Sequence, residues 1–256
     1  MNIVLPISQT SAGYFCPVPV GSGTRVNPNA GQITRLLWNS SSFYDALQAQ
    51  VVRRMTKSIQ FGAWYTWARS IDTSSASAVG SQFLNSIQNL PWFDTSLNRG
   101  LSDFDIRHNG VLNAIWLVPG PHDEGGVRWF ASGWQIGGIY QVSSGLPFTS
   151  IIGGDPLGLK TSYPFDFPDR IFMGDCASAV NPANSVHYIK TQCFSFPTPA
   201  TRMGNRGRNS LIGPGLSNFD FSPTKNNQIK RISDSLNIQF RAEFFNVLNS
   251  HEFLAP

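Results

Sequence analysis

Apolar and polar residues alternate over long stretches of this chain. From residue 236 to residue 244 every even position is apolar, and the odd positions are polar or charged. The same period of two runs from Ile59 to Trp67 and from Trp134 to Val142. A period of two predicts β-strands that have one apolar face and one polar face.

The length of these runs separates two kinds of β-protein. The runs extend over about 10 to 14 residues, whereas ordinary strands have about 5–6 and a tilted transmembrane strand needs about 9–11. A charge on the lipid side of such a strand costs about 2–4 kcal/mol at mid-depth. Arg241 and Glu243 both fall on the polar side of their run. The pattern therefore predicts transmembrane strands around a wet interior.

The connections between the predicted strands alternate in length. Turns are predicted near residues 55–57, 119–126 and 226–234, and long polar stretches at 72–103 and 153–215. Short periplasmic turns and long extracellular loops are typical of outer-membrane barrels. The fold expected for residues 1–256 is therefore all-β, an antiparallel transmembrane β-barrel segment with 153–215 as a long extracellular loop. Its strands are predicted at Phe43–Arg54, Ser58–Ser70, Phe104–Val118, Trp129–Ser150, Leu216–Lys225 and Ser235–Asn249.

The alternation also predicts where side chains point. The lipid-facing set is expected to be Ile59, Phe61, Tyr65, Trp67, Trp134, Ile136, Tyr140, Leu236, Ile238, Phe240 and Phe244. The lumen-facing set is expected to be Gln60, Trp64, Gln135, Gln239, Arg241 and Glu243. Trp92 and Phe93, in a predicted outer loop, are candidates for contact with a ligand at the outer surface.

Composition narrows the class further. The 256 residues are 12% aromatic and only 13% charged, which argues against simple disorder. The net charge of +4 is scattered along the chain, so no nucleic-acid partner is expected. The sequence contains no nucleophile or metal signature, and we expect neither an enzyme nor a cofactor. The N-terminus has no signal-peptide pattern, so an exported protein would need a longer precursor.

Cys176 and Cys193 are separated by 17 positions in a stretch rich in Asn, Ser and Pro. A disulfide between them would stabilise the loop by about 3 kcal/mol and would imply an oxidising compartment. The alternative is two unrelated thiols. Cys16 is left over in either case.

Several motifs, taken in order, resemble the TonB-dependent outer-membrane receptors of the Oar-like type, which often carry a carboxypeptidase-regulatory-like domain. The similarity covers most of residues 27–253. The motifs include Phe43-Tyr-Asp-Ala-Leu-Gln48, Tyr65-Thr-Trp-Ala-Arg-Ser-Ile-Asp72, Asp105-Ile-Arg-His108, Asn205-Arg-Gly-Arg-Asn-Ser-Leu-Ile-Gly-Pro-Gly215 and Phe240-Arg-Ala-Glu-Phe-Phe-Asn-Val-Leu-Asn249. For the third of these we expect a hydrogen-bond network of Asp105, Arg107 and His108 near the barrel rim, and the alternative is that His108 faces the lumen and contacts a ligand.

The resemblance implies a 22-stranded barrel with an internal plug, which imports a scarce ligand at the expense of the proton gradient. The partners implied are outer-membrane lipid, the remainder of the receptor chain, and TonB through the N-terminal part. The chain departs from this plan because it has no plug and no TonB box, has room for about six strands of about 10 residues, and ends soon after Asn249. We therefore expect a fragment of the receptor barrel, located in the bacterial outer membrane, whose ligand the sequence does not identify.

Two other classes of protein stay open. A soluble, secreted β-sandwich that binds carbohydrate would use the tryptophans as sugar platforms, but its apolar strand faces would need a partner sheet. A hydrolase on a β-scaffold is the third possibility, and it lacks a recognisable nucleophile.

Overall fold

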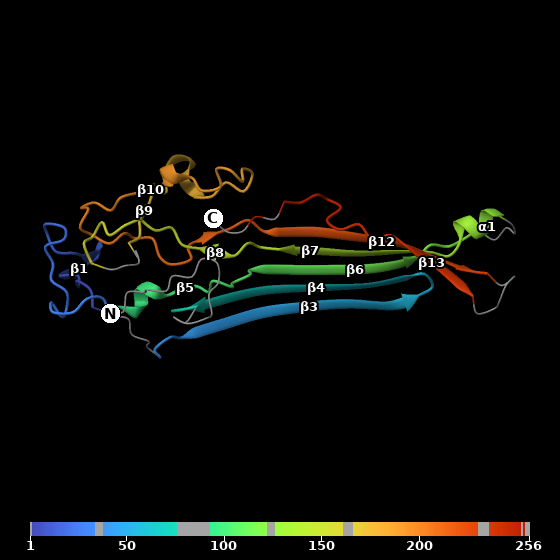
Figure 1. Cartoon of the computed structure of the whole chain (residues 1–256), viewed down its shortest axis with the longest axis horizontal. Helices are drawn as coiled ribbons and strands as arrows, with labels where there is room; N and C mark the ends of the chain where they lie inside the picture. Colours follow the sequence, from blue (N-terminus) through green and yellow to red (C-terminus); the bar gives the residue numbers. More distant parts are fainter. Residues whose placement is uncertain are drawn as a thin grey trace.

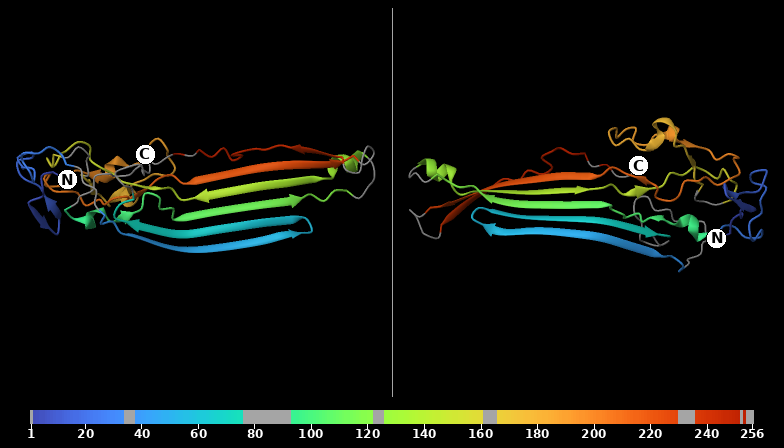
Figure 2. Two further views of the ribbon diagram at one scale, coloured as in Figure 1. Left: turned by 60° about the horizontal axis from the view of Figure 1, so that its bottom comes forward. Right: turned by 180° about the vertical axis from the view of Figure 1, so that it is seen from behind.

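A long antiparallel sheet, one layer thick, runs through most of the molecule and carries irregular loops at one end (Figures 1 and 2). The structure is a computed structural model that describes residues 2–33, 38–75, 93–121, 126–160, 166–229, 236–251 and 253. Six strands follow one another across the sheet in the order β13-β12-β7-β6-β4-β3, and the short β5 also pairs with β4. Their bounds are β3 Ser42–Thr56, β4 Ile59–Asp72, β5 Gly100–Leu101, β6 His108–Leu117, β7 Trp134–Ser143, β12 Leu216–Gln228 and β13 Asn237–Arg241.

The remaining elements are short. Six small strands, β1 Ser8–Thr10, β2 Gly13–Phe15, β8 Pro147–Phe148, β9 Asp169–Arg170, β10 Phe194–Ser195 and β11 Leu211–Ile212, form two-stranded pairs. The helical segments are η1 Thr95–Asn98, α1 Gly126–Ala131, η2 Gly174–Ala177 and η3 Thr191–Cys193. Within the described ranges, no helix has the length and apolar character needed to cross a membrane. The predicted all-β, antiparallel class is therefore confirmed.

The strand register places apolar side chains on one surface of the sheet, which we call the apolar face. Residues paired directly across an antiparallel ladder lie on the same face. Phe61 pairs with Ala114, which pairs with Gly138, which pairs with Phe221, so one apolar row crosses four strands. The face also contains Leu47, Ala49, Val51, Ile59, Ala63, Tyr65, Trp67, Leu112, Trp116, Ile136, Tyr140, Val142, Phe219, Ile238 and Phe240.

Ionisable side chains on this face lie toward its two ends. Asp45, Arg69 and His108 lie toward the loops, and Arg53 and Lys225 lie toward the short turns. Between these ends, β4 runs from Ile59 to Trp67, a length of about 26 Å at 3.3 Å per residue. The lipid-facing band of an outer-membrane barrel is about 25 Å tall. The apolar face therefore has the dimensions that such a band requires.

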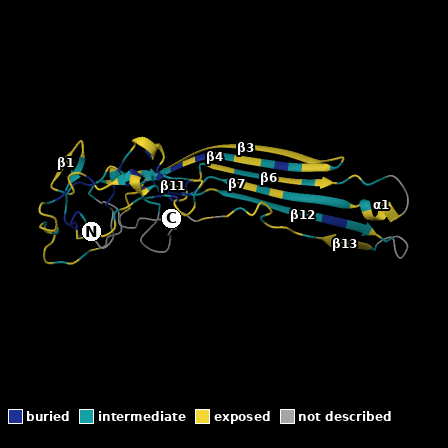
Figure 3. Cartoon of the chain, turned by 90° about the horizontal axis from the view of Figure 1, so that it is seen from above, coloured by how far each residue is buried: buried dark blue, intermediate teal, exposed yellow. Residues whose placement is uncertain are grey.

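Nothing in the described part of the chain covers the apolar face as a second sheet, and its side chains are widely exposed (Figure 3). Leu47 is 61% and Phe240 58% exposed. The soluble β-sandwich requires a partner sheet over these residues, so the observed sheet does not have that architecture.

The opposite surface, the polar face, has the complementary composition. The row through Gly62 contains Asn113 and Ile139, and Ile139 pairs with Asp220 on β12. Gln48, Gln50, Gln60, Thr66, Asn109, Gln135, Gln141, Asn218, Ser222, Thr224, Asn226, Gln239 and Arg241 lie on the same side. The period-two prediction thus describes real faces of one sheet.

The predicted strand Phe104–Val118 begins later than expected, at His108. Residues 102–105 form a turn in which the N–H of Asp105 donates to the carbonyl of Ser102 at 2.9 Å. The Asp105 carboxylate accepts the backbone N–H of Ser70. A side chain therefore takes the place of a ladder bond before β6 begins.

The predicted strand Trp129–Ser150 is also shorter, since β7 covers Trp134–Ser143 and α1 precedes it. Gly133 separates the two with a φ of 78°. A Cβ at Gly133 would meet the carbonyl oxygen of Asn226 at 2.2 Å, so only glycine permits this close approach. The helix therefore takes the place of the end of the predicted turn at 119–126 and of the first residues of the predicted strand.

The last predicted strand, Ser235–Asn249, is reduced to Asn237–Arg241. The chain still follows β12, because Ala242 N–H donates to the Pro223 carbonyl at 3.0 Å. Asn246 and Asn249 have positive φ values of 48° and 49° and bound a turn in which the Asn249 N–H donates to the Asn246 carbonyl at 2.8 Å.

Candidate functional site

A hollow of ≈ 500 Å³ lies against the polar face where β7, β12 and β13 meet. Five of the residues that the alternation assigned to the lumen line this hollow: Gln60, Gln135, Gln239, Arg241 and Glu243. Asn113, Asp220, Ser222 and Thr224 add further hydrogen-bonding groups. The hollow therefore gathers side chains from five strands and the segment after β13.

Both signs of charge are present in the hollow. Arg241 forms an ion pair with Glu243, and both side chains are largely accessible to water. The carboxylate of Asp220 accepts the backbone N–H of Asn246 at 2.9 Å and the Asn218 amide at 3.1 Å. These groups can hydrogen-bond a polar ligand. The described residues contain no cluster of three or more His, Cys, Asp or Glu that could hold a metal ion.

Trp64 also lies on the polar face, away from the lining of the hollow. Its indole ring lies across Gly62, where an added Cβ would meet the ring at 2.2 Å. The side chain is 36% exposed. Gly62 thus lets a large aromatic side chain lie flat on the sheet, and that ring surface is open to a ligand or to another wall of the lumen.

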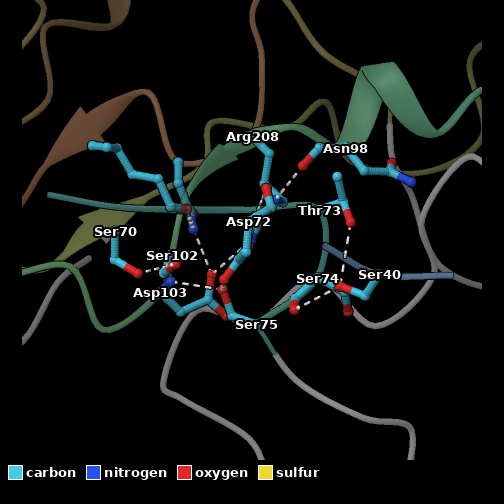
Figure 4. Close-up of polar contacts among 12 residues, drawn as sticks. Ser40, Ser70, Asp72, Thr73, Ser74, Ser75, Asn98, Ser102, Asp103 and Arg208 are labelled. Carbon is cyan, nitrogen blue, oxygen red and sulfur yellow. Dashed lines mark hydrogen bonds and ion pairs between the residues drawn. The ribbon is translucent and has the colours of Figure 1, made fainter. Parts of the chain in front are cut away.

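A buried charge cluster, the Arg208 clasp, holds the loops to the end of β4 (Figure 4). Arg208 forms ion pairs with Asp72 and Asp103, and the Asp103 contact is 3.2 Å. Its Nε donates to the carbonyl of Asn98 at 2.8 Å, and Nη1 donates to Ser75 Oγ at 3.2 Å. Every nitrogen of this guanidinium is therefore bonded to a segment distant in sequence.

A second polar group lies beside the clasp. Ser70 Oγ and Ser102 Oγ are 2.8 Å apart, and the Ser70 N–H donates to Asp105. Asp105 also lies 3.6 Å from Arg107, as the predicted network requires. His108 has a different partner, because its Nδ1 is 2.7 Å from the hydroxyl of Tyr65 on the apolar face. That part of the predicted network is wrong, since His108 starts the strand and its side chain follows the apolar face.

The loops beyond the clasp form an outer-loop module from the described parts of residues 2–33, 93–107 and 144–215. One apolar cluster contains Ile3, Cys16, Leu157, Leu159 and Met203, and a second surrounds the Cys176–Cys193 pair. The structure joins these two cysteines in a disulfide with a Cα–Cα distance of 5.3 Å, and Cys16 is a buried free thiol.

Two further buried arginines connect the loops of this module. Arg170 donates to the carbonyls of both disulfide cysteines, at 3.1 Å to Cys193 and 2.5 Å to Cys176. Arg202 donates to the carbonyls of Ala12 and Met203 and pairs with Asp169. Irregular loops leave carbonyls without ladder partners, and these guanidinium groups supply the missing donors.

Asp166 is an unusual group in the same module. It is 1% exposed, no side chain of the described residues hydrogen-bonds its carboxylate, and the backbone N–H of Leu157 favours its charged form. Burial, and then the nearby charge of Asp155, raise the pKa of Asp166 to about 7. Burial also raises the pKa of the Cys16 thiol to about 12, with Asp166 contributing. The thiol of Cys16 is therefore neutral at physiological pH, whereas the carboxyl group of Asp166 titrates close to that pH.

The other predicted site residues are placed as follows. The lipid-facing candidates on β4, β7 and β13 share the apolar face. Phe244 bridges Phe221 of that face, but it also lines the hollow. Leu236 lies one residue before β13, where its carbonyl accepts the N–H of Ile229. Phe93 packs edge-on against Tyr14, with ring centroids 5.5 Å apart. Trp92 lies outside the described residues.

Sequence reasoning missed the clasp. Arg208 lies within a motif that the resemblance picked out, but its partners are 105 and 136 positions away. Alternation reports neighbours on one strand and carries no signal for such distant pairs.

One comparison with known proteins agrees with this geometry. A family model described as an outer membrane beta barrel domain matches residues 5–256. A search of curated proteins finds no match. A search of solved structures also finds none.

Proposed function

We propose that this chain, which belongs to the outer membrane beta barrel domain family, forms part of the barrel wall of a TonB-dependent receptor. Its family membership locates it in the bacterial outer membrane, in contact with lipid. The TonB-dependent role goes further than the family does. It is supported by the ordered motifs of the Oar-like receptors, from Phe43 through Asn249.

One observation carries the proposal: a single sheet has a lipid-compatible face and a polar face that bears a hollow. The apolar face presents side chains such as Trp67 and Phe240 without cover. The polar face gathers Gln135, Arg241 and Asp220 around ≈ 500 Å³ of open space. In a barrel, the first face meets the bilayer and the second lines the lumen.

The two edges of the sheet indicate that further strands belong to the same barrel wall. In the described structure β3 pairs only with β4, and β13 pairs only with β12. Bare strand edges are not tolerated in hydrocarbon, because their N–H and C=O groups would have no partners. In the receptor we expect each edge to pair with a further strand of the barrel.

The outer-loop module is the ligand-selecting part of this proposal. The Arg208 clasp joins it to the end of β4, and the Cys176–Cys193 disulfide closes one loop within it. Loops carried on a rigid wall are the usual place for specificity. We assign selection of the ligand to this module and its passage to the polar face.

The test is a deletion of the gene in a strain whose TonB can be depleted. Growth would be compared on four defined media: iron-chelated, cobalamin-limited, a single polysaccharide as carbon source, and peptides as nitrogen source. We expect the deletion strain to grow more slowly than its parent on one of these media. Once TonB is depleted the two strains should grow equally, because import then stops in both. A defect that persists without TonB would overturn the receptor assignment and indicate a passive porin. Normal growth on all four would also count against it.

A further inference from the structure

The helix α1 lies at the short-turn end of the sheet (Figures 1 and 3), and it exposes large apolar side chains. Val127 is 71%, Trp129 58% and Phe130 67% exposed. A connection that faces only water has no reason to present three such residues in four positions. From the sequence these residues were expected to form the end of a turn and the start of a strand, and no contact with lipid was expected for them.

The structure shows on which side of the sheet α1 lies. Lys225 pairs with Trp134 across the β12–β7 ladder, two positions from the pair Pro223–Ile136, so both side chains lie on the apolar face. Lys225 Nζ is 5.5 Å from the Trp134 ring and 5.4 Å from the Trp129 ring. The Trp134 indole N–H donates to the Phe130 carbonyl at 2.9 Å. The helix therefore continues the apolar face beyond the last ladder pair.

Lys225 brings a positive charge to this position. It is 6% exposed, and its ammonium donates to the carbonyls of Trp129 and Ser132 and to Asn227 Oδ1, at 2.7, 2.9 and 2.9 Å. These three acceptors are neutral, so the bonds satisfy the ammonium protons without cancelling the charge. A cation between two tryptophans at the end of an apolar band matches the level of lipid phosphates.

The position of α1 is fixed by close backbone contacts. A Cβ at Gly133 would collide with the Asn226 carbonyl, and one at Gly120 would meet Ser132 Cβ at 2.5 Å. These contacts hold the helix against the ends of β7 and β12.

We propose that α1 is an interfacial anchor that inserts Val127, Trp129 and Phe130 into the phospholipid leaflet at the short-turn end of the barrel. The occupant is phospholipid because the helix continues the lipid-compatible face and packs against Lys225 of β12 at headgroup level. The proposal rests on the outer-membrane location and does not depend on TonB or on the imported ligand.

The test measures tryptophan quenching in the full chain, reconstituted into phosphatidylethanolamine–phosphatidylglycerol vesicles that contain phosphatidylcholine brominated on its acyl chains. The W129F variant supplies the Trp129 signal by difference. W38F is the matched control, since Trp38 precedes β3 at the loop end and is 91% exposed. We expect the Trp129 signal to be quenched by brominated lipid and protected from acrylamide, and the Trp38 signal to show the reverse.

A second readout keeps the test independent of Trp129. Phe130→Cys carrying an environment-sensitive fluorophore should shift to the blue when the detergent is exchanged for these vesicles, whereas the same label at Phe172→Cys in the outer-loop module should not. Acrylamide quenching of Trp129 equal to that of Trp38, together with an unshifted label at position 130, would overturn the anchor. That pair of results would leave α1 as a surface for another protein.

Discussion

Replacing Arg208 by alanine tests whether the outer loops depend on one buried cation. The guanidinium and both of its carboxylate partners are nearly inaccessible, with side chains 2–3% exposed. Truncation leaves Asp72 and Asp103 buried near one another without a counter-charge. It also removes the donors to the carbonyls of Asn98 and Asp72.

The expected cost follows from that burial. Removing one partner of a buried ion pair destabilises by about 3–5 kcal/mol, because an uncompensated charge is left behind. Arg208→Lys should have an intermediate effect, since it keeps the charge but loses the planar fork that reaches several acceptors at once. The matched control is Arg241→Ala, whose partly exposed ion pair with Glu243 should contribute only about 0–1 kcal/mol.

The assay is thermal unfolding of the full chain in detergent, combined with limited proteolysis of the loops at 25 °C. R208A should melt well below R241A and should be cut faster within residues 93–107 and 204–210. The triple variant D72N/D103N/R208M should recover part of the loss, because no unpaired charge then remains buried. If R208A keeps the melting temperature and cleavage pattern of the original chain, the clasp does not hold the loops and the argument is refuted.

Three further predictions concern other parts of the molecule. The folded-state pKa of Asp166 is about 7 against an ordinary 3.8, so stability should fall as pH rises from about 4 to 7, by up to about 4 kcal/mol; Asp166→Asn should flatten that slope in melts taken across this range, and an equal slope in both proteins would contradict it. Replacing Cys176 and Cys193 together by serine should cost about 3 kcal/mol of local stability for a loop of this length, seen as faster proteolysis of residues 176–193, and unchanged cleavage would count against a structural disulfide. Leu112→Arg should cost about 2–4 kcal/mol of folding free energy and so lower the yield of heat-stable, membrane-assembled protein. Asn113→Arg, one position away on the polar face, should assemble normally. Similar yields for the two variants would show that the two faces are misassigned.

The faces of the sheet were predictable because strand geometry imposes a period of two on the sequence. Phe219 and Phe221 alternate with Asn218, Asp220 and Ser222 on β12, and the structure places the two sets on opposite sides. The lining of the hollow followed from the same rule, since five of the residues assigned to the lumen by alternation meet there. Local periodicity thus gives both the strands and the residues that face the hollow.

Strand ends and loop contacts were not predictable in this way. The run Val127-Arg-Trp-Phe130 has the aromatic content of a strand, yet it forms α1, and β7 begins only after Gly133, whose φ is 78°. Arg208 is one of several arginines in basic loops, and its role depends on Asp72 at the end of a distant strand. A single sequence contains no period that connects such positions.

Hydrogen bonding of the backbone explains why the two halves of the molecule use such different residues. In the sheet the backbone N–H and C=O groups of each strand bond to those of its neighbours. The side chains are therefore free to meet lipid on one face and polar groups on the other. The loops form only short strand pairs, so many of their carbonyls have no strand partner. Arg170, Arg202 and Arg208 each donate to carbonyls of other segments. Lys225 does the same at the opposite end of the sheet, for carbonyls released where α1 ends. Four buried cations therefore stand at places where regular pairing stops, and we expect these positions to help the loops and turns keep their shape.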